Sequence, residues 1–212
     1  MDALLPDILS IIYEFIDTKQ LIWASRTCRK WHKVYHDNLW KYKIDVTQWS
    51  NKIKDKHLES FKNVRTINLK SCYQIEGPGL KHLDKAINVD LSYCKIIGTD
   101  LILLKSVKTL NVRECSGIND YGLEQLATFL NIEAINIYGC SKITIDGLNY
   151  IRNVPSITMC ACNFETNALI DYVNKYKNVS FQACSNYSFD RLQLLKEQCP
   201  SIFLIKDIHY KW

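Results

Sequence analysis

The sequence has few of the features that nucleotide-dependent enzymes and membrane proteins require. It contains only 7 glycines in 212 residues, and none of them forms a glycine-rich phosphate-binding loop. Its longest aliphatic runs are about four residues, against the roughly 20 that span a bilayer. It contains no nucleophile elbow and no convincing pair of acid–base carboxylates. These absences argue against an enzyme and against a membrane partner.

The distribution of charge and the use of cysteine further restrict the expected partners and cellular compartment of the protein. The net charge of +5 is spread along the chain, whereas nucleic-acid-binding proteins concentrate basic residues in a stripe. No basic leader with an apolar stretch opens the sequence, so we expect no signal peptide and a cytoplasmic or nuclear location. The 9 cysteines are then expected to stay reduced. We therefore expect no nucleic-acid partner.

Two short patterns resemble parts of metal sites. Cys160 and Cys162 form half of a zinc ligand set, but no second pair completes it. His32 and His36 have the spacing of two ligands on a helix, yet the residues between them lack the glutamate of a metalloprotease. A solvated helix surface is the stronger interpretation of the histidines, and we expect no metal and no cofactor.

The first 45 residues show helical periodicity. Pro6 suits the first position of a helix, and apolar residues then recur at helical spacing up to Ile16. Asp17 and Thr18 are candidate caps of a second short helix, and a third is expected from about Cys28 to Tyr35. A unit this small is marginal alone. Its first helix is apolar on more than one face, so we expect a partner to cover the excess.

These residues resemble the F-box, the motif that binds the Skp-family adaptor of SCF (cullin–RING) ubiquitin ligases. The resemblance rests on Leu5-Pro6-Asp7-x-Leu9, Ile12, Phe15-Ile16-Asp17, Leu21, Cys28-Arg29-x-Trp31 and Leu39-Trp40, in order and at family spacing. Ile8 departs from it, because the family usually has an acidic residue there. The resemblance implies adaptor contacts from Leu5, Pro6, Ile8, Leu9, Ile12, Leu21, Cys28, Trp31, Leu39 and Trp40. For Ile12, Leu21 and Trp31 a purely internal core role is an equal alternative.

The rest of the chain repeats with a period of about 22 residues. Cysteines recur at 72, 94, 115, 140, 162 and 184. Apolar residues precede each cysteine by five and three positions, which predicts a short strand with alternate side chains inward. Three positions after the cysteine comes another inward residue, such as Ile75, Ile97 or Ile118, and then a helix with paired leucines. The cysteines are expected to pack inside as small apolar residues.

A strand, a turn and a short helix in this period define the leucine-rich repeat. Cys115-Ser-Gly-Ile118-Asn-Asp-x-Gly122-Leu123 most resembles the cysteine-containing repeats found beside F-boxes. We expect an α/β protein: a three-helix F-box at 1–45, a linker and half-repeat cap at 46–63, and leucine-rich repeats at 64–212. The array would contain about six repeats and a seventh strand at Ile202 and Leu204, with parallel strands on its concave face and helices on its convex face.

Polar side chains are expected to line the concave face. The outward positions lie two and four residues before each cysteine, and solenoids bind partners with this surface. Each residue alone is more simply a solvated strand residue, but the set as a whole favours a binding role. The predicted target-binding residues are Lys70, Asp90, Asn111, Arg113, Asn136, Tyr138, Thr158, Gln182 and Phe203.

The F-box resemblance implies a substrate receptor of an SCF ubiquitin ligase that has no catalytic residues of its own. The helices would dock on the adaptor, and the array would hold a target protein near a ubiquitin-charged E2. An interaction module or inhibitor without ligase output, which sequesters the adaptor or another partner, remains the alternative.

Overall fold

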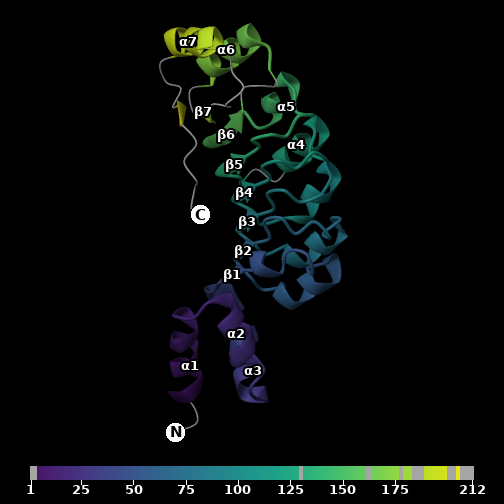
Figure 1. The fold of residues 1–212 in the computed structure, drawn as a ribbon, viewed down its shortest axis with the longest axis vertical. Coiled ribbons are helices and arrows are strands. Elements are labelled where there is room, and N and C mark those ends of the chain that lie inside the picture. The colour runs from purple at the N-terminus through teal and green to yellow at the C-terminus, as the bar shows by residue number, and fades with distance from the viewer. Residues whose placement is uncertain are drawn as a thin grey trace.

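The computed structural model describes residues 4–128, 131–160, 164–176, 179–182, 189–199 and 204–205. Three helices stand at one end of a long, curved stack of strands and helices (Figure 1). They are α1 (Leu4–Glu14), α2 (Thr18–Ser25) and α3 (Arg29–Asp37), followed by the short 3-10 helix η1 (Leu39–Lys41).

Eight strands within the described segments form one sheet in which every neighbouring pair is parallel. They are β1 (Lys43–Asp45), β2 (Thr66–Asn68), β3 (Asn88–Asp90), β4 (Thr109–Asn111), β5 (Ala134–Asn136), β6 (Ser156–Cys160), β7 (Val179–Gln182) and β8 (Leu204–Ile205). Their order in the sheet is their order in the sequence. Each repeat therefore contacts mainly its neighbours, as in a solenoid.

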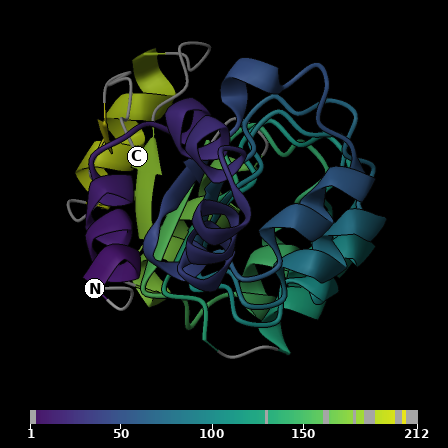
Figure 2. The ribbon, with the colours of Figure 1, turned by 90° about the horizontal axis from the view of Figure 1, so that it is seen from below.

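Short helices connect successive strands, and those between β2 and β6 form the opposite wall of the stack from the strands (Figure 2). The connecting helices are η2 (Thr47–Trp49), η3 (Asp55–Phe61), η4 (Pro78–Leu83), η5 (Gly98–Leu103), α4 (Asp120–Ala127), α5 (Ile145–Tyr150), α6 (Thr166–Lys175) and α7 (Phe189–Gln198). No helix in the described part of the chain is both long enough and apolar enough to cross a membrane. This architecture confirms the predicted α/β fold, with N-terminal helices followed by a leucine-rich-repeat solenoid.

The sheet register aligns the inward residues of all repeats. Ile67 pairs with Val89, Val89 with Leu110, and Leu110 with Ile135. These four side chains are at most 3% exposed. The leucines of the connecting helices, such as Leu80 and Leu101, are fully buried against them. Burial of aligned apolar columns is the main stabilising term in such a stack.

The predicted inward position of Ile97 is wrong. Ile97 is 51% exposed, whereas its neighbour Ile96 is fully buried. The step from Cys94 to Cys115 is one residue shorter than the step from Cys72 to Cys94. The missing residue falls directly after Cys94, so the inward isoleucine follows the cysteine by two positions instead of three. The rest of this repeat keeps its frame, because Leu101 is buried as Leu80 is.

The helical unit and the solenoid share a boundary strand. β1 pairs with β2, with Ile44 opposite Ile67. The Asp45 backbone N–H donates to Thr18 Oγ1 in α2 over 2.8 Å. One continuous apolar core runs from Leu9 in α1 to the last repeats. The segment expected as a half-repeat at 46–63 therefore has its own strand, which lies inside the range 1–45 assigned to the helical unit.

Candidate protein-interaction surfaces

The three N-terminal helices pack around a small aromatic core. The Tyr13 ring meets the Trp31 ring edge-on at a centroid distance of 6.1 Å, and the Tyr42 ring at 6.0 Å. Burial raises the pKa of Tyr13 to about 12, so its hydroxyl stays protonated at neutral pH. That hydroxyl donates to the Trp31 carbonyl over 3.4 Å. Edge-to-face pairs of this kind add stability beyond the buried area alone.

A capping box fixes the turn between α1 and α2. The Gln20 N–H donates to Asp17 Oδ1 over 2.8 Å, and the Asp17 N–H donates to Gln20 Oε1 over 3.2 Å. These two bonds satisfy backbone groups that a helix N-terminus leaves free. The orientation of α2 relative to α1 is thereby defined by local sequence.

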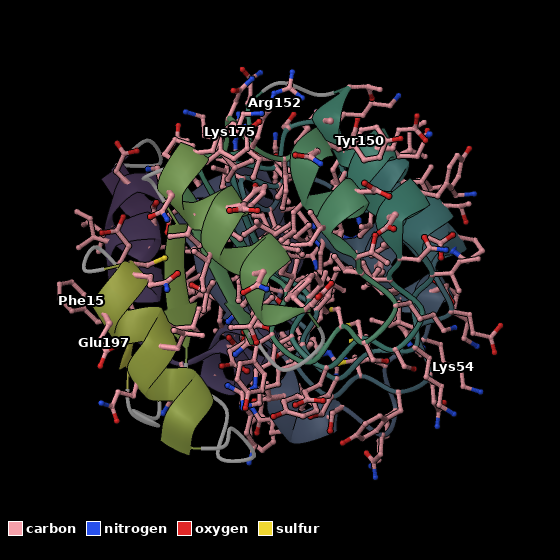
Figure 3. The ribbon with its side chains drawn as sticks, turned by 90° about the horizontal axis from the view of Figure 1, so that it is seen from above. Phe15, Lys54, Tyr150, Arg152, Lys175 and Glu197 are labelled. Carbon is pink, nitrogen blue, oxygen red and sulfur yellow. The ribbon has the colours of Figure 1, made fainter. Side chains whose placement is uncertain are left out.

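A large apolar face remains exposed on this unit. On α1, Ile8, Ile11 and Ile12 are 44%, 55% and 45% exposed, and Phe15 is 84% exposed. On α2, Trp23 is 67% exposed. Phe15 points outward from the edge of the molecule (Figure 3). Trp23 borders a hollow lined also by Val46 and Trp49 of the first repeat. We refer to these five exposed residues, four along one side of α1 and one on α2, together as the apolar face. Clustered exposure of large apolar side chains marks an interaction site in a soluble domain.

The structure divides the predicted adaptor-binding residues into three groups. Ile8, Ile12 and Cys28 are exposed, and Pro6 and Trp31 are half-buried. Leu9, Leu21 and Leu39 are at most 2% exposed and lie in the core. The side chains of Leu5 and Trp40 lie outside the described residues.

Three residues of the apolar face were not among the predicted adaptor contacts. They are Ile11, Phe15 and Trp23. The signal for two of them was present, because Ile8, Ile11 and Phe15 follow helical spacing and therefore share one side of α1. Nothing in the spacing alone distinguishes this side from the buried side that holds Leu9 and Tyr13.

A ladder of Asp and Asn side chains runs across the concave face. In the four repeats of Cys72, Cys94, Cys115 and Cys140, the residue four positions before the cysteine accepts a hydrogen bond from the backbone N–H two residues later. Examples are Asn111 Oδ1 with the Arg113 N–H (3.1 Å) and Asn136 Oδ1 with the Tyr138 N–H (3.0 Å). The Asn111 amide also donates to Asp90 Oδ2 over 3.0 Å.

This ladder changes the interpretation of three predicted target-binding residues. Asn111 and Asn136 are only 5% and 7% exposed, and Asp90 is half-buried. Their polar atoms bond to the backbone and to one another, which satisfies groups at the strand ends that would otherwise be buried without partners. They therefore stabilise the strand ends, and they offer little surface to a ligand.

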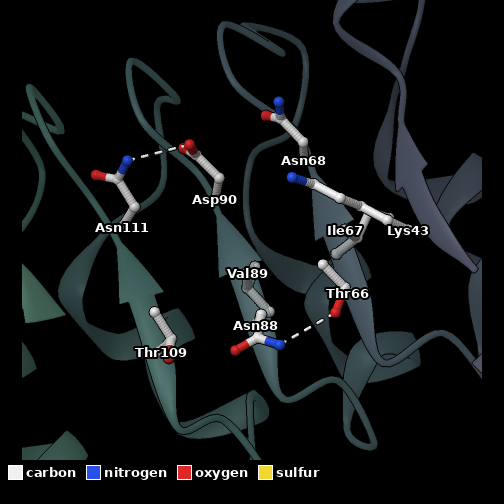
Figure 4. Close-up of a pocket in the computed structure, with 9 residues that line it drawn as sticks. All are labelled: Lys43, Thr66, Ile67, Asn68, Asn88, Val89, Asp90, Thr109 and Asn111. Carbon is white, nitrogen blue, oxygen red and sulfur yellow. Dashed lines mark hydrogen bonds between the residues drawn. The ribbon is translucent and has the colours of Figure 1, made fainter. Parts of the chain in front are cut away.

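A hollow of about 340 Å³ lies over the first strands of this ladder. Figure 4 shows the polar side chains that surround it, including Lys43 reaching from β1 toward β2. Its lining residues are Lys43, Thr66, Ile67, Asn68, Asn88, Val89, Asp90, Thr109 and Asn111. The small and polar lining gives a shallow depression rather than an enclosed active-site pocket.

Other predicted target-binding residues lie at the strand ends. Lys70 is exposed, Arg113 and Tyr138 are half-buried, and Thr158 is half-buried on β6. The Arg113 guanidinium carbon lies 4.0 Å from the centroid of the Tyr138 ring. Phe203 and the side chain of Gln182 lie outside the described residues.

The repeated cysteines serve the core. The Cys94, Cys115 and Cys140 thiols donate to the carbonyl oxygens of Leu69, Leu91 and Val112 in the preceding repeats, over 3.1–3.2 Å. Burial raises the pKa of Cys72, Cys115 and Cys140 to about 12. The thiol form therefore dominates at neutral pH, whereas nucleophilic and metal-binding cysteines need the thiolate. Cys162, Cys184 and the side chain of Cys160 lie outside the described residues.

The histidine pair lies on the α3 surface. The rings of His32 and His36 have their centroids 4.3 Å apart. Burial, then the nearby charges of His32 and Lys62, lower the pKa of His36. No group of three or more His, Cys, Asp or Glu side chains in the described segments is arranged to hold a metal ion.

Comparisons with known proteins bear on both parts of the chain. A family model described as F-box-like matches residues 3–44. Among solved structures, internalin C2 from Listeria monocytogenes aligns with a TM-score of 0.47 and 16% sequence identity, over 67% of this chain and 60% of that chain. A search of the curated proteins finds no match. F-box domains and leucine-rich repeats are generally non-catalytic interaction modules.

Proposed function

From an F-box-like domain at residues 3–44 that continues into a leucine-rich-repeat solenoid, we propose that this protein is the substrate-recognition subunit of an SCF ubiquitin ligase. In this proposal the helical unit binds a Skp-family adaptor, and the concave face of the solenoid binds a target protein. The observation that supports it most is the apolar face, because it lies within the F-box-like segment and is exposed in the isolated chain.

The proposed adaptor site is the apolar face together with the exposed members of the predicted set. Phe15 and Trp23 are the two largest exposed anchors, and large aromatic side chains dominate the binding energy of stable interfaces. Half-buried Pro6 and exposed Cys28 would extend this surface, whereas Leu9, Leu21 and Leu39 would support it from below.

The continuous core supports the proposed mechanism. The bond from Asp45 to Thr18 and the pairing of β1 with β2 join the helical unit to the solenoid without a flexible linker. A target bound on the concave face would then have a defined position relative to the adaptor. Holding two reactants close in a fixed orientation accelerates their reaction without catalytic groups in the receptor.

Affinity purification with mass spectrometry tests this function. The full chain and the Ile12→Glu/Phe15→Glu variant are expressed side by side with a Thr99→Glu/Ser106→Glu control, whose new charges lie at exposed solenoid positions. We expect the wild type and the control to capture adaptor, cullin and targets, and the variant to capture targets only. Absence of the adaptor from the wild-type sample would contradict the proposal.

Reconstituted ubiquitination then separates the ligase from its alternative. A captured target should be ubiquitinated when the wild-type chain joins purified adaptor, cullin, RING protein and E2, and not when the Ile12→Glu/Phe15→Glu variant does. Adaptor binding without ubiquitin transfer to any captured target would favour the non-ligase interaction module.

A further inference from the structure

Cations and aromatic rings alternate along one edge of the concave face. The Lys70 ammonium lies 5.7 Å from the Tyr93 ring centroid, and the Arg113 guanidinium lies 4.0 Å from that of Tyr138. The four residues come from four consecutive repeats, each just beyond the end of its strand, β2 to β5. We call Lys70, Tyr93, Arg113 and Tyr138 the cation–aromatic rim.

Arg113 stacks on Tyr138 but has no anionic partner among the described residues. Its Nε atom is buried without a hydrogen-bond acceptor, and no carboxylate within the described ranges forms an ion pair with it. The two nearest carboxylates by sequence and strand order have other neighbours. Asp90 accepts bonds from Ser92 and Asn111, and the Glu114 carboxylate lies beside Gly139, 2.6 Å from where a β-carbon would stand. A stacked guanidinium that pairs with no carboxylate in the described ranges is suited to bind a carboxylate of a ligand.

The backbone at Tyr93 is left-handed, as it is one position before the cysteine in the neighbouring repeats. Tyr93 has φ of 63°, and the equivalent residues Ser71, Glu114 and Gly139 have φ of 61°, 59° and 73°. The Tyr93 N–H donates to the Arg113 carbonyl over 2.8 Å, which holds the turn in this conformation. Because four successive repeats share this conformation, it belongs to the turn of the repeat and sets the direction in which the Tyr93 side chain leaves the backbone. Its ring lies within the rim, between the two cations in repeat order.

We propose that the cation–aromatic rim binds an extended acidic segment of the target protein, with a carboxylate on Arg113 and an apolar or aromatic side chain against Tyr93. Three strand spacings separate the ends of the rim, about 14 Å, which matches about four residues of extended peptide. Two cations are too few for the continuous basic stripe that a nucleic-acid backbone requires. This proposal names the target class for the proposed receptor and rests on that function.

The test measures direct binding of a chemically defined acidic polymer to the full chain. A fluorescein-labelled random copolymer of glutamate and tyrosine is titrated with wild-type protein and followed by fluorescence anisotropy. A lysine–tyrosine copolymer and oligouridylate serve as comparison ligands. The variants are Arg113→Gln and Arg113→Lys. The matched control is Lys105→Gln, which removes the same charge at an exposed position outside the concave face. Thermal unfolding by circular dichroism checks that each variant is folded.

We expect the wild type to prefer the glutamate–tyrosine copolymer and Arg113→Gln to weaken binding about tenfold, as loss of one charge-assisted contact predicts. Arg113→Lys keeps the charge but loses the planar fork, so its affinity should fall between these two. Lys105→Gln should bind within about twofold of wild type, since only a screened distant charge is removed. Absence of wild-type binding, an Arg113→Gln affinity equal to wild type, or tighter binding of oligouridylate would each overturn the rim proposal.

Adaptor capture measured on the same samples keeps the two proposals distinguishable. Arg113→Gln should capture the adaptor as well as wild type does, because the rim lies outside the F-box-like segment. If the protein captures no adaptor but Arg113→Gln still weakens binding of the glutamate–tyrosine copolymer, the rim proposal holds and the receptor function is refuted. If adaptor capture is normal and Arg113→Gln does not change copolymer binding, the receptor function holds and the rim proposal is refuted.

Discussion

Truncation of two residues on the same helix should lower the stability of the protein by very different amounts. Leu9 and Ile12 both lie on α1, but Leu9 is 2% exposed and Ile12 is 45% exposed. Leu9→Ala removes core packing beside Tyr13 and Leu39 in the apolar core. Removing a buried leucine typically costs about 2–5 kcal/mol, which combines the lost transfer free energy with the cavity left behind.

Ile12→Ala should cost far less in the isolated protein. About half of the Ile12 side chain is already in water, so the lost burial amounts to about 1 kcal/mol. Alanine also has the higher helix propensity, which offsets a few tenths of a kcal/mol. We therefore expect the free energy of unfolding to fall by about 3 kcal/mol for Leu9→Ala and by less than about 1 kcal/mol for Ile12→Ala.

Urea unfolding followed by far-ultraviolet circular dichroism measures both values on the full chain. The Thr99→Ala variant, at an exposed position in η5, gives the baseline for a surface truncation. An Ile12→Ala loss equal to that of Leu9→Ala would show that the outer side of α1 is packed within the chain, and the apolar face would then be no free docking surface.

Three further predictions concern the concave ladder, the thiols and the pH dependence of stability. Asn111→Ala removes the acceptor of the Arg113 N–H and the donor to Asp90, and should lower the free energy of unfolding by about 1–3 kcal/mol in urea titrations; a change near zero would refute its structural role. Iodoacetamide labelling with peptide mass spectrometry should modify exposed Cys28 in the native protein and leave buried Cys115 unmodified until urea is added; rapid native labelling of Cys115 would contradict its position in the core. The pKa of His36 is lowered by burial and by neighbouring positive charge, so its stability contribution is present above the unfolded value of 6.5 and is lost as pH falls toward the lower folded pKa. His36→Gln should flatten the decline of unfolding free energy between about pH 7 and about pH 5, and an unchanged slope would refute this assignment.

The periodicity of the sequence was sufficient to predict the solenoid. Strands align in register because each repeat places its inward residues at the same distance from the cysteine, as Ile67 and Leu69 do before Cys72. One repeat is a single residue shorter than its neighbour, so counting from its cysteine predicts Ile97 at the inward position, whereas the structure buries Ile96 there. Fixed spacing predicts the fold of an array, but insertions and deletions have to be located from burial.

The surfaces were harder to predict than the fold. Outward position on a strand predicts that a side chain is available for binding, yet Asn111 and Asn136 are nearly buried and bonded to the turn that follows them. Whether a polar strand residue bonds to its own backbone depends on the local turn, which alternation does not specify. Similarly, helical spacing grouped the apolar residues of α1 without separating buried Leu9 from exposed Phe15.

The rim shows what only three-dimensional pairing reveals. Lys70 and Arg113 could be listed from the sequence as outward residues, but the rings that face them lie 23 and 25 residues further along. Tyr93 occupies the position one residue nearer its cysteine than Tyr138 does. The left-handed backbone there turns its ring toward the cation of the preceding repeat.

Binding of a Skp-family adaptor by the apolar face of α1 and α2 can be measured by isothermal titration calorimetry of purified adaptor into the full chain. Ile12→Glu/Phe15→Glu is the perturbed protein, and Thr99→Glu/Ser106→Glu is the control. We predict saturable one-to-one binding for wild type and control, and an affinity at least about 100-fold weaker for the variant, since two apolar anchors are replaced by charges that must be buried. Equal affinity of the variant and wild type, or no adaptor binding by the folded wild-type chain, would contradict the account.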